Sequence, residues 1–278
     1  MNALTDPARP AVSGGQATLE VEMVFGESTV TSAYSATPMK LLTPVSRGLS
    51  VWAYTSNFGG GLVAGDQTRV DLTIGPEARC FLGTQSSTKV YRNPRGQPCS
   101  HTTHAMLASG AALVFLPEPI QAFADSHYTQ RQEFHLQSGA SLVLLDWFTS
   151  GRAARGERWN FAHLESRNDV FVNGERILVD PLRLSSMAVP KQMGRFNCLA
   201  SLLLFGSPLK TISETLLQVI ASRPVKKNSP LSASASPVRD GVLLRLAGES
   251  VEKVRQEIHA HLYCLRDLLG DDPWSRKW

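Results

Sequence analysis

The sequence predicts a mainly β fold, either a β-superhelix or a stacked antiparallel β body, with two helices in the C-terminal third. Three observations support this expectation. Apolar and polar residues alternate with a period of two near the N-terminus, and a unit of strand, glycine turn and strand recurs along the chain. Helical spacing of apolar residues appears only after about Pro208.

The alternation predicts the first strands. Apolar side chains occupy every second position between Thr18 and Phe25, which is typical of a half-buried strand. The same spacing returns between Val70 and Ile74. Farther along, the apolar runs Val170-Phe171-Val172 and Ile177-Leu178-Val179 flank Asn173-Gly174, a pair that accepts the positive φ of a tight turn, so a hairpin is expected there.

The recurring unit becomes visible when Ala78, Ala111 and Ala140 are aligned. Equivalent apolar residues then stand four positions before each alanine (Ile74, Leu107, Leu136), two after it (Cys80, Leu113, Leu142) and four after it (Leu82, Phe115, Leu144). One unit cannot bury both of its faces, so successive units are expected to stack into a superhelix. Three imperfect copies also fit an antiparallel sandwich, which stays the alternative.

The expected organisation is one domain over residues 1–278. Its β body covers about 17–207, and helices are added at about 209–223 and 250–270. Serine and proline dominate the segment between the helices, which predicts a mobile loop over about 226–238.

Local signals set the ends of these late elements. Pro224 ends the first helix, and Gly270 can end the second with a left-handed residue. Apolar residues between Val242 and Leu246 predict one more strand.

Composition excludes several classes of protein. The 28 basic and 24 acidic residues leave a net charge of +4 without a basic run, so no nucleic-acid partner is expected. The apolar stretches are too short to span a bilayer, and Met1–Gly15 lacks the features of a signal peptide, so we expect a cytoplasmic protein without a membrane partner. Four dispersed cysteines predict reduced, mostly buried thiols: Cys80, Cys99, Cys198 and Cys264.

Several motifs that could indicate an active site are incomplete. Gly59–Asp66 is rich in glycine but lacks the Gly-Lys-Ser/Thr ending of a phosphate-binding loop, which leaves Asp66 as its one candidate for a cation or a hydrogen bond. His101 and His104 are expected on opposite faces of a strand, as surface residues. Ser150 has no glycine-flanked elbow. We therefore expect no enzyme.

The aligned units also place polar residues at one edge of the stack. Thr84, Pro117 and Asp146 take equivalent positions after the second strand of each unit. The side chains that would line this edge are Gln85, Lys89, Glu118, Asp146 and Arg152. Their oxygens suit a polar conduit, a divalent cation in transit or a protein interface, whereas the simpler alternative is a solvated rim where Glu118 pairs with Lys89 or Arg152.

Glu118 and Asp146 also support a second hypothesis. Two carboxylates can share the acid and base roles of a glycosidase, and β-superhelices host enzymes that act on polysaccharides. The alternative function is therefore a β-superhelical carbohydrate-active hydrolase that uses these two residues.

Four motifs in order resemble the urease accessory protein family UreD, also called UreH. They are Gly60-Gly61-Leu62-Val63-Ala64-Gly65-Asp66, Thr84-Gln85-Ser86-Ser87-Thr88-Lys89-Val90-Tyr91-Arg92, Leu116-Pro117-Glu118-Pro119-Ile120, and Asp146-Trp147-Phe148-Thr149-Ser150-Gly151-Arg152 with Gly156-Glu157. Each motif is weak alone, but their order and spacing fit over most of the chain.

The resemblance implies a non-enzymatic scaffold that helps to insert nickel into apo-urease. It implies binding to apo-urease, to UreF and, through UreF, to the GTPase UreG, and it leaves room for a homodimer within the complex. No cofactor is expected to bind tightly, and nickel would pass through in transit. The conduit or interface residues that the resemblance carries over are Asp66, Thr84, Gln85, Lys89, Glu118, Asp146, Arg152 and Glu157, with transient nickel contacts at Asp66, Glu118 and Asp146.

Overall fold

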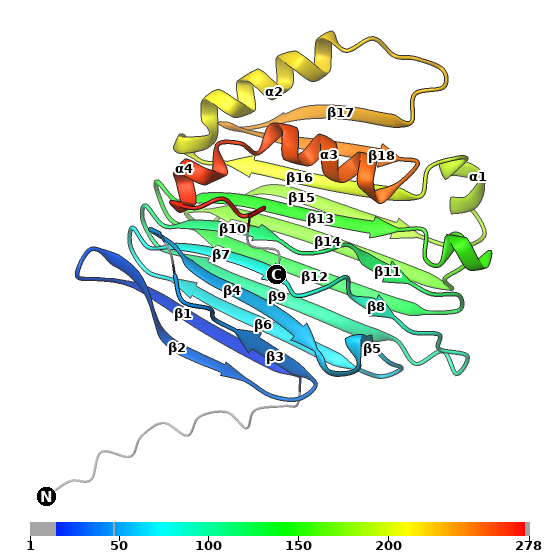
Figure 1. The fold of residues 1–278 in the computed structure, drawn as a ribbon, viewed down its shortest axis with the longest axis horizontal. Helices are drawn as coiled ribbons and strands as arrows, with labels where there is room; N and C mark the ends of the chain where they lie inside the picture. The colour runs from blue at the N-terminus through cyan, green and yellow to red at the C-terminus, as the bar shows by residue number, and fades with distance from the viewer. Residues whose placement is uncertain (1–14, 47, 276–278) are drawn as a thin grey trace, which may run out of the picture.

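The computed structural model describes residues 15–46 and 48–275, which form two large β-sheets and a layer of helices (Figure 1). The seven-stranded sheet runs in the order β15 (Glu175–Leu184), β14 (His163–Val172), β12 (His127–Leu136), β9 (Cys99–Leu107), β6 (Gln67–Ile74), β1 (Gln16–Val24) and β2 (Glu27–Ser35). The eleven-stranded sheet runs in the order β17 (Leu231–Val238), β18 (Gly241–Gly248), β16 (Cys198–Phe205), β13 (Ser141–Thr149), β10 (Ala112–Leu116), β7 (Arg79–Thr84), β4 (Val51–Asn57) and β3 (Met39–Leu42). Three short strands, β5 (Gly61–Leu62), β8 (Lys89–Val90) and β11 (Ile120–Ala122), complete it.

The middle of the chain winds as a parallel β-solenoid of about four turns. A complete turn consists of a strand in the eleven-stranded sheet, a short strand and a strand in the seven-stranded sheet, as in β7, β8 and β9. Equivalent strands of successive turns pair in parallel, so β4, β7, β10 and β13 lie side by side, as do β6, β9, β12 and β14. The superhelix is therefore confirmed. Antiparallel strands occur only towards the two ends of the described stack, for example β2 against β1 and β15 against β14.

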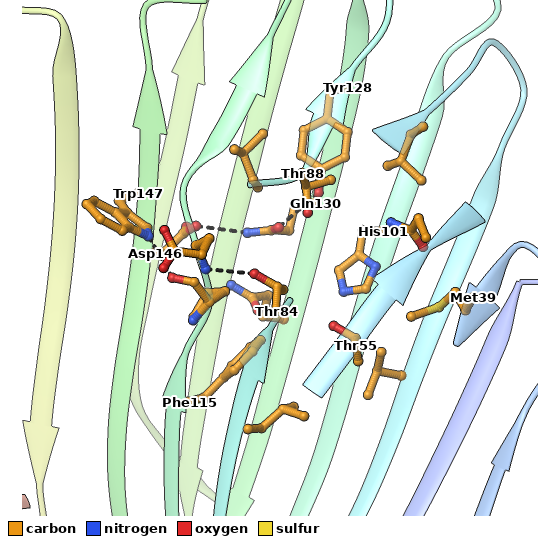
Figure 2. Close-up of a pocket in the computed structure, with 18 residues that line it drawn as sticks. Met39, Thr55, Thr84, Thr88, His101, Phe115, Tyr128, Gln130, Asp146 and Trp147 are labelled. Carbon is orange, nitrogen blue, oxygen red and sulfur yellow. Dashed lines mark hydrogen bonds between the residues drawn. The ribbon is translucent and has the colours of Figure 1, made fainter. Parts of the chain in front are cut away.

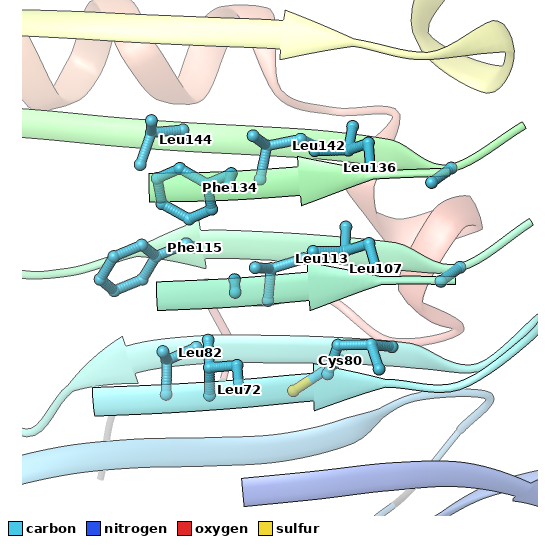
Figure 3. Close-up of a cluster of buried hydrophobic side chains, with 14 of the residues drawn as sticks. Leu72, Cys80, Leu82, Leu107, Leu113, Phe115, Phe134, Leu136, Leu142 and Leu144 are labelled. Atoms are coloured by element: carbon cyan, nitrogen blue, oxygen red, sulfur yellow. The ribbon is translucent and has the colours of Figure 1, made fainter. Parts of the chain in front are cut away.

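Residues that are equivalent in the sequence repeat are direct cross-strand partners in the solenoid. Cys80 pairs with Leu113 and Leu113 with Leu142, and the same relation joins Leu82, Phe115 and Leu144 (Figure 3). These side chains fill the core between the two sheets. Gly110 and Gly139 turn with φ of 70° and 78°, the left-handed region that suits glycine, and Glu77 takes this position in the first unit with φ of 59°.

Helices cover the other face of the eleven-stranded sheet. These helices are α2 (Lys210–Ser222), α3 (Val251–His261) and α4 (Leu265–Leu269). The short α1 (Val189–Met193) packs elsewhere, through Val189, and single 3₁₀ turns occur at η1 (Phe58–Gly60), η2 (Ala153–Arg155) and η3 (Ser207–Leu209). Apolar side chains of α2, α3 and α4 form a second core with this sheet. None of the helices in the described part of the chain has both the length and the apolar character that crossing a bilayer requires.

The late elements correct two predictions. The last expected helix is two helices, because the chain leaves helical geometry at Leu262 before α4 begins, and α4 then ends at Gly270 with φ of 76°, as expected. The expected mobile loop is wrong for Leu231–Val238, which form the edge strand β17. Leu231, Ala233 and Ala235 pack on the helical core, and Pro237 is tolerated because an edge strand can lose a backbone donor.

Two other local predictions, the hairpin at Asn173-Gly174 and the unpaired cysteines, are confirmed. Asn173 and Gly174 take positive φ values of 49° and 81° in the hairpin between β14 and β15. All four cysteines are unpaired thiols, and three of them are buried (Cys80, Cys99 and Cys198).

Candidate functional site

From the start to the end of each strand, the inner face of the seven-stranded sheet changes from polar to apolar. Near the glycine turns it carries leucine, isoleucine and phenylalanine, but closer to the start of each strand it carries hydroxyl, amide and imidazole groups. We call this band the polar stripe, which consists of Thr68, His101, Thr103, Gln130, Gln132, Ser166 and Asn168. Cross-strand register aligns Thr68, His101, Gln130 and Ser166 in one row across β6, β9, β12 and β14. The stripe therefore runs along the axis of the solenoid.

Asp146 faces the stripe from β13 of the opposite sheet. Only 5% of the residue is exposed, and its carboxylate accepts hydrogen bonds from Gln130 Nε2 at 3.0 Å, Ser166 Oγ at 2.6 Å and Asn168 Nδ2 at 3.0 Å. Burial raises the pKa of Asp146, whereas these three donors act in the opposite direction. Tyr128 donates to Gln130 Oε1 at 2.9 Å and so fixes the orientation of that amide. Asp146 is thus a buried carboxylate held by three neutral donors.

His101 is the imidazole of the stripe. Its Nδ1 lies 2.8 Å from Thr68 Oγ1 and its Nε2 lies 3.1 Å from Thr103 Oγ1. The residue is partly buried and borders the first small cavity between the sheets, and burial lowers the pKa of its ring to about 4. At neutral pH the ring is uncharged, which is the form that can bind a metal ion.

Two cavities meet at Asp146. The first has a volume of about 50 Å³ and lies between the sheets, where Thr84, His101, Gln130 and Asp146 line it (Figure 2). The second has a volume of about 330 Å³ and is bordered by Asp146, Asn168, Asp180, Ser201 and Arg245, among others. We call the two cavities together the polar passage, because a buried carboxylate is their shared wall.

The second cavity has a carboxylate of its own in its lining, that of Asp180. Its carboxylate accepts hydrogen bonds from Ser201 Oγ at 2.8 Å and from Arg245 Nη2 at 2.6 Å. In the first cavity, the passage is therefore lined by the Asp146 carboxylate with amide and hydroxyl groups. In the second, it is lined by the Asp180 carboxylate with its counter-ion, Arg245.

Glu118 connects the first cavity to the helical layer. Its carboxylate forms a bidentate ion pair with Arg255 of α3, at 2.6 and 3.2 Å, and its backbone N–H donates to Thr84 Oγ1 at 2.8 Å. The Arg255 guanidinium lies 5.0 Å from the centre of the Trp147 ring, whose Nε1 donates to the carbonyl of Pro117. In place of the expected pairing of Glu118 with Lys89 or Arg152, helix α3 brings Arg255 to this carboxylate, and Arg152 pairs with Glu157.

Comparison with known proteins identifies the family. The profile of the UreD urease accessory protein family matches residues 13–278. The chain belongs to the UreD family. It is 41% identical to urease accessory protein UreD of Sorangium cellulosum (strain So ce56), over 98% of this chain and 86% of that protein. It is 36% identical to urease accessory protein UreD of Anaeromyxobacter sp. (strain Fw109-5), over 96% and 92% of the two chains, and 35% identical to urease accessory protein D of Arabidopsis thaliana, over 92% and 98%.

Of the residues that the UreD resemblance implies as conduit or interface residues, some lie at the first cavity and the others do not. Thr84, Glu118 and Asp146 line the first cavity together, and Gln85 lies beside Thr84 and Glu118 in a surface groove of about 370 Å³. Thr84, Glu118 and Asp146 therefore lie together around one cavity in the interior of the solenoid, whereas the sequence placed them along an outer edge.

The remaining predicted residues lie elsewhere in the chain. Asp66 Oδ2 accepts a hydrogen bond from the Val63 N–H at 2.8 Å and so stabilises its own turn, and Lys89 is exposed on β8. Arg152 and Glu157 pair with each other at 2.8 Å, and Arg152 also stacks on Phe123. None of these four borders the passage. For Arg152 and Glu157 the reason is the turn at Ala153–Arg155, which brings the two side chains together.

Sequence reasoning missed most of the polar stripe. It placed His101 on the surface, which is wrong, although His101 and His104 do face opposite sides of β9 as expected. The missed signal lies in the repeat itself. Aligned strands change from polar to apolar at the same inward position, as Gln130 and Gln132 precede Phe134, and Ser166 and Asn168 precede Val170.

Proposed function

We propose that this UreD-family chain is a non-catalytic scaffold of urease maturation, which brings nickel into apo-urease. Two findings support the proposal. Its relatives are named urease accessory proteins, and the match covers nearly the whole chain. The observation that carries the mechanism is the position of Asp146, a buried carboxylate that borders both cavities of the passage.

The chemistry of the passage suits a divalent cation in transit. Carboxylate and imidazole groups are ligands of Ni²⁺, and both occur along the passage, in Asp146 and the neutral His101. Asp146 already accepts three hydrogen bonds, so a passing ion would compete with its donors. Weak, successive contacts of this kind favour release as well as entry, as conduction requires.

The proposal includes protein partners in the cytoplasm. The chain would bind apo-urease and UreF, with the GTPase UreG joining through UreF, and a homodimer would form within the complex. Exposed apolar side chains on the helical side, Val219 at 41% and Tyr263 at 71%, provide surface of the kind found in protein contacts. The ion pair between Glu118 and Arg255 links that layer to the first cavity.

Urease activation in cells that lack this protein tests the proposal. The wild-type chain should restore urease activity, and the control Asp240→Asn should do the same, because Asp240 is 71% exposed and borders neither cavity. Asp146→Asn should co-purify with UreF as well as the wild type does but activate urease poorly. Full activation by Asp146→Asn would refute conduction through the passage, and failure of the wild type to restore activity would refute the whole proposal.

The geometry does not favour the hydrolase hypothesis. Glu118 and Asp146 share a cavity of about 50 Å³, which has room for a few water molecules rather than a polysaccharide. Both oxygens of Glu118 are bound by Arg255, so this carboxylate is not free to protonate a leaving group.

A further inference from the structure

The outer face of the seven-stranded sheet carries a cluster of three metal-binding side chains, His104, Glu133 and His135. We propose that this cluster binds a divalent first-row transition metal ion of the nickel and zinc class. The site lies on the opposite face of the sheet from the polar stripe, and the inference does not rest on the proposed function. We call it the outer cluster.

Strand register brings the three residues together. On the parallel neighbours β9 and β12, Glu133 is the direct partner of His104, and His135 follows two residues later on the same face. All three point outward, because the intervening Ala105 and Phe134 are fully buried in the core between the sheets. The cluster therefore lies on two paired strands rather than on a loop.

The distances are close to those of a coordinated ion. One ligand atom from each residue lies within 4.8 Å of the others, and His135 Nε2 is 2.5 Å from Glu133 Oε1. Bond lengths of about 2.0–2.1 Å place two ligand atoms of one zinc ion about 3.0–3.5 Å apart. Small side-chain movements within the cluster, with Glu133 and His135 moving slightly apart, would therefore bring all three ligand atoms to the separations of one coordinated ion.

The surroundings orient the ligands and leave space for the ion. The His135 ring stacks on Phe171 of β14, with centroids 4.7 Å apart and an interplanar angle of 5°, and its centroid is 5.4 Å from that of His104. The side chains of His135 and Glu133 are 30% and 49% exposed, so water can fill the remaining coordination positions. Two imidazoles and one carboxylate with open positions form a ligand set that suits zinc and nickel.

Neighbouring carboxylates do not occupy the cluster. Asp71 is the cross-strand partner of His104, and Asp169 is that of Glu133. Arg69 binds Asp71 at 2.6 Å and Arg167 binds Asp169 at 2.6 Å. These two carboxylates are therefore held by their own arginines, and Glu133 is the acid left to share with the histidines.

Equilibrium dialysis of the full, tag-free chain against NiCl₂ and ZnCl₂, with metal counting, tests the proposal. The wild type should bind one more ion than His104→Ala or His135→Ala. Each substitution should raise the Kd for the ion at the outer cluster at least tenfold. Glu133→Gln should weaken it as well while keeping the size of the side chain. The matched control is His163→Ala, because His163 lies on the same sheet 3.5 Å from Glu165 but outside the cluster, and it should bind as the wild type does.

Two results would overturn the inference. One is equal stoichiometry and Kd for the wild type and both histidine variants, with circular dichroism showing that the variants are folded. The other is an ion that Asp146→Asn removes and the histidine variants do not, which would place metal binding in the passage alone. Urease activation by the His104→Ala chain reports separately on the proposed function.

Discussion

The buried imidazole of His101 should make the free energy of unfolding depend on pH. In the folded chain burial lowers the pKa of His101 to about 4, from an ordinary value of 6.5. The unfolded chain therefore binds a proton at His101 more strongly than the folded chain does. Stability from this group is complete above about pH 6.5 and is lost as the pH falls towards about 4, because protonation then favours unfolding.

The size of this loss follows from the two pKa values. Between about pH 7.5 and about pH 5, the wild type should lose about 2 kcal/mol of unfolding free energy through His101 alone. His101→Gln removes the titrating group but keeps a polar side chain near Thr68 and Thr103. The difference between the two proteins should therefore depend on pH by the same amount, while the other six histidines cancel in the comparison.

Urea denaturation at the two pH values measures the effect. The free energy of unfolding of the wild type should fall more steeply with acidification than that of His101→Gln. Parallel pH profiles would refute the reasoning, because they would show that the ring is protonated equally well in both states. His127→Gln is the control, since His127 lies on β12 next to Tyr128 and faces away from the polar stripe.

Three further substitutions or probes test the packing. Arg255→Ala should lower the unfolding free energy by about 1–3 kcal/mol, because it leaves Glu118 without its cation, and an unchanged urea midpoint would contradict this role. Leu113→Ala should cost about 2–5 kcal/mol, since its side chain is fully buried between the sheets, and a loss below that range in urea denaturation would mean that the core relaxes around it. The pKa of Cys80 is raised by burial to about 12, so iodoacetamide should leave it unmodified at neutral pH until urea unfolds the chain, and mass spectrometry of native protein that finds it alkylated would disprove its enclosure.

The solenoid itself could be predicted from the sequence to a large extent. The period of two defines which side chains face the core, and a turn residue before Ala78, Ala111 and Ala140 closes each unit. Both are local signals, because they depend on backbone preferences and on near neighbours. The aligned residues therefore became cross-strand partners in the structure, as Cys80 and Leu113 show.

The Ser/Pro segment shows where composition misled the prediction. Residues 231–238 contain small side chains that alternate between the helical core and the second cavity, but serine and proline are also typical of loops. Pairing with β18 decides between the two, and that pairing depends on a partner strand already held by β16. A strand of this kind is stabilised by its neighbour more than by its own propensity.

The sequence by itself determined the repeat, the direction in which each side chain faces and the family to which the chain belongs. Only the tertiary structure decided which polar groups meet. Glu118 pairs with Arg255, 137 residues away, and Asp146 from one sheet closes the polar stripe of the other. The physical reason is that hydrogen bonds and ion pairs act over a few ångströms, so their partners are chosen by the packing of sheets and helices and not by position along the chain.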